Sequence, residues 1–189
     1  MINAELGHCK TLPEFYKSIR EQQEGEHGAD YCAQHDALIH MFTNGGCKTY
    51  RELGTHQGGT AAAVMLQNPE YMDLIDIDMH RYNKFLAPIA REYAKEHDIK
   101  LSLKEVSSAS LAAIGPLVDV MLIDSVHRWV YTKEELKYHA SSVKKYIVFH
   151  DTTTCLDIWQ GINEYCKTEP FEILDRFLPN VGYTVIKRK

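Results

Sequence analysis

Apolar and polar residues follow two alternating rhythms along this chain. Short apolar runs, typical of buried strands, are separated by segments whose apolar residues recur every three or four positions, typical of helices. The expected strands cover residues 47–53, 71–77, 100–105, 118–123, 146–149, 171–177 and 183–187. The expected helices cover residues 11–23, 30–43, 60–66, 83–97, 110–114, 133–138 and 156–167, with breaks at 24–28 and 44–46.

Regular alternation of strand and helix predicts an α/β fold, a doubly wound and mostly parallel Rossmann-like sheet with helices on both faces. The last two strands have no helix between them, which predicts an antiparallel C-terminal edge. We expect one domain over residues 1–189, with N-terminal helices in 1–46 and a ligand-binding core in 47–189. The first strand is the least typical, because Lys48-Thr-Tyr-Arg-Glu52 is polar for the centre of a sheet.

A glycine-rich turn, Glu52-Leu-Gly-Thr-His-Gln-Gly-Gly-Thr60, joins the first strand to the next helix. Glycine lets the backbone turn sharply and approach a ligand closely, and the N–H groups that open a helix are free to bind one. The spacing is neither the G-x-G-x-x-G of dinucleotide-binding proteins nor the G-K-[ST] of phosphate loops. An acid ahead of the first glycine suits a cationic ligand better than a pyrophosphate.

Acids also end the second strand, in Tyr71-Met-Asp-Leu-Ile-Asp-Ile-Asp78. Asp76 lies 22 residues after Gly54, and an acid at about 20 residues after such a turn binds ribose hydroxyls in nucleotide-binding units. Asp78 is the close alternative.

Two later strands end in acids and histidines, which can bind a metal ion or transfer a proton. Val118-Asp-Val-Met-Leu-Ile-Asp124 is followed by His127, and Tyr146-Ile-Val-Phe-His150 is followed by Asp151. Because ligands bind beyond the carboxyl ends of parallel strands, we expect these side chains to share one crevice with the glycine turn.

These four strand ends, taken in order, resemble the class I S-adenosylmethionine-dependent methyltransferases, over roughly residues 50–153. The nearest branch includes catechol O-methyltransferase, macrocin O-methyltransferase and cephalosporin hydroxylase-like proteins. The resemblance implies a seven-stranded sheet and a set of cofactor-binding residues. That set is Glu52, Gly54, His56, Gly58, Thr60, Asp76, Ser108 and Asp124. For His56 a purely solvent-facing position is an equal alternative, and Ser108 could instead simply begin a helix.

The resemblance to the catechol enzymes also implies a divalent cation on Asp124, His150 and Asp151. Mg²⁺ prefers oxygen ligands, so the histidine shifts the expectation toward Mn²⁺ or Fe²⁺. The alternative is structural, with Asp151 capping a turn and His150 bonding a carbonyl. His127 lies where those enzymes carry a lysine base, and histidine can accept a hydroxyl proton near neutral pH. An ordinary surface histidine is the alternative.

Composition narrows the class of protein. The 189 residues are 44% apolar and 25% charged, with a net charge of −5, which argues against general nucleic-acid binding. No apolar run is long enough for a membrane span, and the N-terminus lacks the features of a signal peptide. Five cysteines without C-x-x-C spacing indicate reduced thiols and a cytoplasmic location.

The sequence therefore predicts a transferase that uses S-adenosylmethionine to methylate a hydroxyl of a small molecule or sugar, and the resemblance implies Mg²⁺ or Mn²⁺ as a helper ion. Methyl transfer without metal, other chemistry on the same fold and a non-catalytic S-adenosylmethionine-binding subunit remain alternatives. An NAD-dependent enzyme is disfavoured by the missing third glycine. The oligomeric state stays open, with a homo-oligomer among the possibilities.

Overall fold

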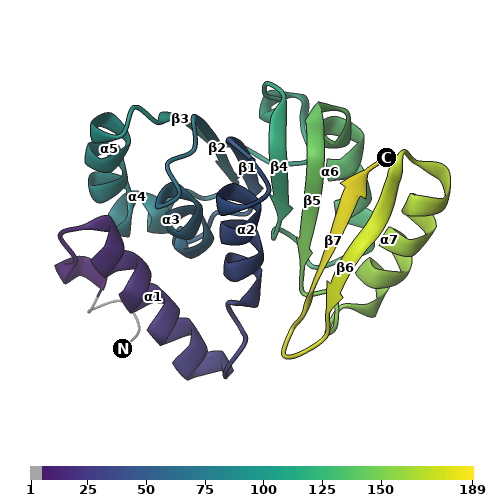
Figure 1. The fold of residues 1–189 in the computed structure, drawn as a ribbon, viewed down its shortest axis with the longest axis horizontal. Coiled ribbons are helices and arrows are strands. Elements are labelled where there is room, and N and C mark those ends of the chain that lie inside the picture. The colour runs from purple at the N-terminus through teal and green to yellow at the C-terminus, as the bar shows by residue number, and fades with distance from the viewer. Residues whose placement is uncertain (1–5) are drawn as a thin grey trace.

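The computed structural model describes residues 6–189 and is built around one seven-stranded sheet (Figure 1). The strands are β1 (Thr49–Leu53), β2 (Tyr71–Asp76), β3 (Lys100–Glu105), β4 (Val118–Ile123), β5 (Val143–His150), β6 (Phe171–Phe177) and β7 (Tyr183–Arg188). Their spatial order is β3-β2-β1-β4-β5-β7-β6. β1 to β5 pair in parallel, and β7 lies antiparallel between β5 and β6. The mostly parallel sheet and its antiparallel edge are thus confirmed, with the last strand second from that edge.

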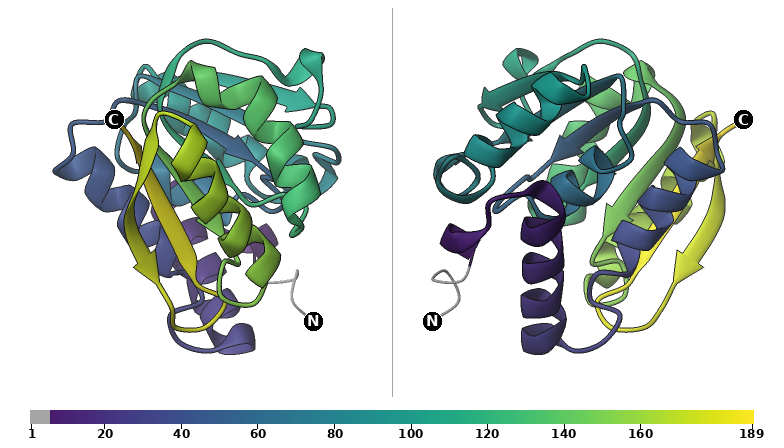
Figure 2. Two further views of the ribbon diagram at one scale, coloured as in Figure 1. Left: turned by 90° about the vertical axis from the view of Figure 1, so that its right-hand side faces the viewer. Right: turned by 60° about the vertical axis from the view of Figure 1, so that its left-hand side comes forward.

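Helices cover both faces of the sheet, as expected (Figures 1 and 2). They are α1 (Leu12–His27), α2 (Ala33–Thr43), α3 (Gly59–Met65), α4 (His80–Phe85), α5 (Ala87–Glu96), α6 (Trp129–His139) and α7 (Leu156–Thr168). Three short 3-10 turns complete the described elements, η1 (Leu6–His8), η2 (Leu111–Ala113) and η3 (Ala140–Ser142). One apolar core lies between α1–α5 and the sheet, and a second lies between α6, α7 and the opposite face. No helix within residues 6–189 has both the length and the apolar character that crossing a membrane requires.

The break expected at residues 24–28 is wrong for most of its length. Helix α1 continues through Gly25 to His27 and ends at Gly28, whose φ of 93° is open to glycine at little cost. Its start follows the sequence closely, because Thr11 and Glu14 form a reciprocal capping box.

Other boundaries also differ from expectation. The single helix expected at 83–97 is two helices that meet at Leu86, where Pro88 in the first turn of α5 has no N–H to continue the ladder. Helix α6 starts at Trp129, four residues before the expected start, and α2 starts at Ala33, three residues late. The helix expected at 110–114 is only the turn η2, so β3 crosses to β4 without a covering helix.

The polar first strand is confirmed at the centre of the sheet, between β2 and β4. Its polar side chains are buried with partners: the Tyr50 hydroxyl donates to Glu52, and Arg51 pairs with Asp73. The polar residues of this strand, which suggest solvent exposure in the sequence, therefore make buried ion pairs and hydrogen bonds.

Candidate functional site

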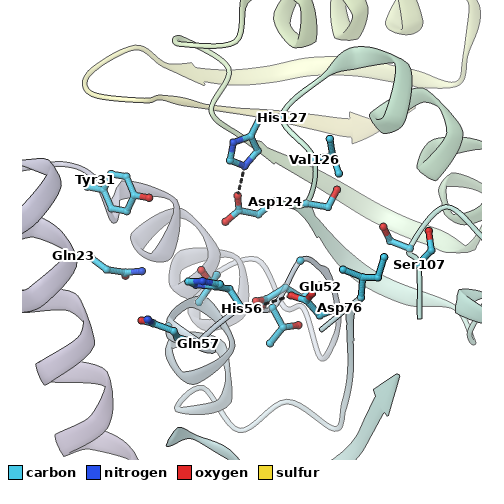
Figure 3. Close-up of a pocket in the computed structure, with 17 residues that line it drawn as sticks. Gln23, Tyr31, Glu52, His56, Gln57, Asp76, Ser107, Asp124, Val126 and His127 are labelled. Carbon is cyan, nitrogen blue, oxygen red and sulfur yellow. Dashed lines mark hydrogen bonds and ion pairs between the residues drawn. The ribbon is translucent and has the colours of Figure 1, made fainter. Parts of the chain in front are cut away.

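A cavity of about 460 Å³ opens at the carboxyl ends of β1, β2 and β4 (Figure 3). This is where β1 and β4 lie side by side and the chain order reverses, the usual ligand site of an open α/β sheet. Its wall comprises Gln23, Tyr31, Glu52, Gly54, Thr55, His56, Gln57, Gly59, Thr60, Asp76, Ile77, Ser107, Ser108, Asp124, Ser125, Val126 and His127. Gln23 and Tyr31 come from the N-terminal helical region, so this region forms part of the site.

The glycine turn is pressed against the end of β4. Gly54 has a φ of 92°, and a Cβ there would lie 2.1 Å from the carbonyl oxygen of Asp124. Only glycine fits this position, so the turn and Asp124 are held at one side of the cavity. Gly58 caps α3 with a φ of 86° but does not line the cavity, whereas Gly59 does.

Two acids face the cavity from neighbouring strands. Glu52 is 1% exposed and accepts a 2.7 Å hydrogen bond from the Tyr50 hydroxyl, and burial raises its pKa well above the usual range. Asp76 is partly exposed and accepts hydrogen bonds from the backbone N–H groups of His56 (2.7 Å) and Asp78 (3.0 Å). Asp78 instead accepts from the N–H of His80 and is absent from the cavity wall, so Asp76 is the cavity acid of this pair.

The remaining residues expected at the cofactor site also line the cavity, each with a partner. The exposed His56 ring is paired with Arg81, and the Thr60 hydroxyl lies 3.0 Å from Nε2 of His35. The Ser108 hydroxyl donates to Glu135.

Glu135 was not predicted. It lies buried on α6 behind the cavity wall and accepts hydrogen bonds from both Ser108 and Ser125, and burial raises its pKa. A glutamate within a helical pattern reads as solvent-facing, so the sequence offered no signal for it.

Asp124, His127, His150 and Asp151 form one cluster at the edge of the cavity. The His127 ring lies 3.3 Å from Asp124 through Nε2 and 2.8 Å from Asp151 through Nδ1. Nδ1 of His150 lies 3.0 Å from Asp124 and 3.5 Å from Asp151. The four side chains predicted from separate strand ends are therefore brought together, although only Asp124 and His127 line the cavity itself.

The charges of this cluster stabilise each other. Hydrogen bonds to Asp124 and Asp151 raise the pKa of His127 to about 10. Asp124 and Asp151 also raise the pKa of His150, against the effect of burial, and the two histidines lower the pKa of both carboxyls. In the ligand-free protein at neutral pH, two imidazolium groups thus balance two carboxylates.

A divalent cation also fits the cluster. One ligand atom each from Asp124, His127 and Asp151 lies within 4.8 Å of the others, which is compatible with a shared ion. This set contains His127 where the sequence favoured His150. The His150 Nδ1 faces the two carboxylates, while its Nε2 is buried without a hydrogen-bond partner among the residues described.

Three residues of the wall lie outside the sequence motifs, namely Gln23, Tyr31 and Ser107. Tyr31 is half-buried and sets its ring edge against His150, with ring centroids 5.8 Å apart. Its partner lies more than a hundred residues away in the chain, and nothing near Tyr31 in the sequence indicates that contact.

No protein-family model matches the chain, and no curated protein matches it. Solved structures do share its fold. A protein from Staphylococcus aureus described as a caffeoyl-CoA O-methyltransferase aligns with a TM-score of 0.68 at 10% identity, over 100% of this chain and 97% of that one. The S-adenosylhomocysteine-bound methyltransferase PaMTH1 from Podospora anserina gives 0.64 at 14% identity, over 94% and 87%. The O-methyltransferase TomG from Streptomyces achromogenes, in complex with S-adenosylmethionine, gives 0.63 at 14%, over 92% and 89%. At these identities the likeness establishes the methyltransferase fold.

Proposed function

We propose that this protein is an S-adenosylmethionine-dependent O-methyltransferase that acts on a small hydroxylated molecule or a sugar. One observation carries the proposal: one cavity at the reversal point of the sheet is lined by the strand-end acids Glu52 and Asp76 and also by Asp124 and His127 of the histidine–carboxylate cluster. The shared fold with methyltransferases supports it.

Asp76 is assigned to the ribose hydroxyls, because its carboxylate faces the cavity and accepts hydrogen bonds readily. The buried Glu52 is assigned to the positively charged part of the cofactor. Bound S-adenosylmethionine would supply an activated methyl group, so the chain's own task is mainly to position donor and acceptor and to exclude water.

At the other end of the cavity, Asp124, His127 and Asp151 would hold a divalent cation, and the histidine favours Mn²⁺ or Fe²⁺ over Mg²⁺. Such an ion would lower the pKa of an acceptor hydroxyl. The balanced charges of the cluster equally favour methyl transfer without metal. His127 serves as general base only in a complex that lowers its pKa, because the ligand-free ring is protonated at neutral pH.

The acceptor is proposed to be a small molecule, because the cavity volume suits one and the net charge of −5 disfavours nucleic acid. Cys32, Cys47, Cys155 and Cys166 are free thiols, which supports a reducing compartment such as the cytoplasm.

Calorimetric titration with S-adenosylmethionine, S-adenosylhomocysteine and NAD tests the cofactor assignment. We expect the first two to bind and NAD not to. Asp76→Ala should weaken binding by about tenfold or more through loss of charge-assisted hydrogen bonds, with Asp78→Ala as the matched control. Equal binding by wild type and Asp76→Ala would remove Asp76 from the site.

A screen of hydroxylated acceptors with labelled methyl donor tests catalysis and metal together. Assays with excess chelator and with added Mn²⁺ or Mg²⁺ separate the two versions of the mechanism. Lost turnover in chelator with retained cofactor binding supports the metal, and full turnover supports the charge-balanced, metal-free version. Cofactor binding without transfer to any acceptor would favour a non-catalytic subunit.

A further inference from the structure

An ionic cluster lies beneath the cavity. It packs against the connection from β3 to β4, which contains the turn η2 but no α-helix. Arg51 and Asp73, both 0% exposed, pair at 2.9 Å, and the Lys104 ammonium lies 3.1 Å from Asp73. Two cations thus share one fully buried carboxylate, although 21% of the Lys104 side chain is exposed. Buried charges are costly unless their hydrogen bonds are satisfied, so the partners of the surplus cation are informative.

Those partners are the carbonyl groups of one segment, residues 106–117, which joins β3 to β4. Lys104 donates to the carbonyls of Ala113 and Ile114, each at 3.2 Å, and Arg51 donates to that of Pro116 at 2.8 Å. The segment also passes so close that a Cβ on Gly115 would lie 2.4 Å from both Arg51 and Asp73. Ser107 and Ser108, at the start of the same segment, form the cavity wall.

His139 completes the connection from the cluster to the wall. Its Nε2 lies 2.8 Å from the carbonyl oxygen of Ser108, and its Nδ1 lies 3.5 Å from the Arg51 guanidinium. A carbonyl only accepts and a guanidinium only donates, so the neutral ring must carry its proton on Nε2. Burial lowers the pKa of His139, in agreement with this neutral form. The Ser108 carbonyl therefore sets the tautomer, and Arg51, whose closest donor bond on this side is to the Ser142 hydroxyl at 2.6 Å, is compatible with it.

We propose that Arg51, Lys104 and His139 are positioning residues that set the Ser107–Ser108 wall of the cavity and thereby control affinity for the nucleoside part of the ligand. This inference rests on the proposed function. The cluster does not contact the cavity, so it acts only through the carbonyl groups of the segment.

Lys104→Met is the sharpest test. It leaves the neutral Arg51–Asp73 pair, so the fold should survive, while the carbonyls of Ala113 and Ile114 lose their donor. We expect S-adenosylhomocysteine and 5′-methylthioadenosine, which lacks the amino-acid part, to lose affinity by the same factor of about tenfold. Amide hydrogen exchange at residues 107–114 should also accelerate in the ligand-free variant. Lys145→Met is the matched control, because Lys145 donates to the carbonyls of Gly45 and Gly46, outside the cavity wall.

His139 gives an independent pair of variants. His139→Leu should lower both affinities, and His139→Gln, whose amide can still donate to Ser108, should restore most of the loss. Unchanged affinity and unchanged exchange in Lys104→Met and His139→Leu would overturn the proposal. If wild type binds neither ligand, the proposed function fails, and the exchange of residues 107–114 still decides whether the cluster positions the wall.

Discussion

At the scale of single residues, the Glu52 carboxyl is buried in surroundings that oppose its charge. The wild-type Glu52 carboxyl, with its raised pKa, costs stability as pH rises above 4.5, because the folded state disfavours the carboxylate. Glu52→Gln removes this cost. The ligand-free variant should therefore be as stable as wild type or more so at pH 8, while its affinity for cationic S-adenosylmethionine falls by about tenfold. Thermal unfolding and calorimetry at the same pH measure the two effects, and unchanged affinity would show that the carboxylate does not face the cation.

His127 gives a second prediction at this scale. Because Asp124 and Asp151 raise its pKa to about 10, a base role requires kcat to rise with pH well above 6.5 when chelator is present. An added divalent cation that binds Asp124, His127 and Asp151 should abolish this rise, since a histidine that holds the ion is no longer available to accept a proton. His127→Ala should lose the rise and about 10²–10⁴ in rate. A pH profile shared by wild type and variant would remove His127 as the base.

Strand ends in the sequence pointed to residues that line the cavity, whereas protonation states could not be predicted. Asp124 and His127 stood out because an acid ends an apolar run and the histidine follows closely, and both line the cavity. The pKa of His127 depends on Asp151, which arrives from the next strand only when the sheet forms. Glu135 shows the same limit, since its two serine partners belong to other segments.

At the scale of elements, strands were predicted better than helix ends. β3, β4 and β6 match their expected bounds, and for β4 the short apolar run has clear limits. The ends of the helices depend on tertiary contacts, which outweigh the weak tendency of a single glycine to break a helix. Gly25 was taken for a break, yet α1 passes through it and ends only where Gly28 adopts a positive φ.

This difference between two glycines of one helix makes a prediction about α1. A Cβ at Gly25 would meet nothing within 4 Å, so Gly25→Ala should stabilise the protein by about 0.5–1 kcal/mol through helix propensity. Gly28→Ala is the opposing control and should destabilise, because its φ of 93° strains any residue with a side chain. Denaturant unfolding measures both. A loss of stability in Gly25→Ala would indicate that α1 frays before His27.

At the scale of the whole molecule, segments far apart in the sequence meet beside the site. The Asn180 side chain, in the β6–β7 connection, donates to the carbonyls of His27 (2.9 Å) and Ala29 (3.1 Å) in the turn between α1 and α2. That turn carries Tyr31, which packs against His150 at the end of β5. The β6–β7 connection therefore holds the turn that brings Tyr31 to the cavity wall, so the shape of the cavity depends on distant parts of the chain.

The stability of the whole molecule should also record the histidine–carboxylate cluster. The folded-state pKa of His127 lies above its unfolded value, so the stability that it contributes is fully present below about pH 6.5 and is lost as pH rises through about 10. The advantage of wild type over His127→Gln in denaturant midpoint should follow this curve. Salt should reduce it, because His127 is half-exposed and screened. His80→Gln, at an exposed position on α4, should leave the curve unchanged. An advantage that is constant from pH 6 to 10 would mean that His127 stabilises the protein by packing rather than by its charge.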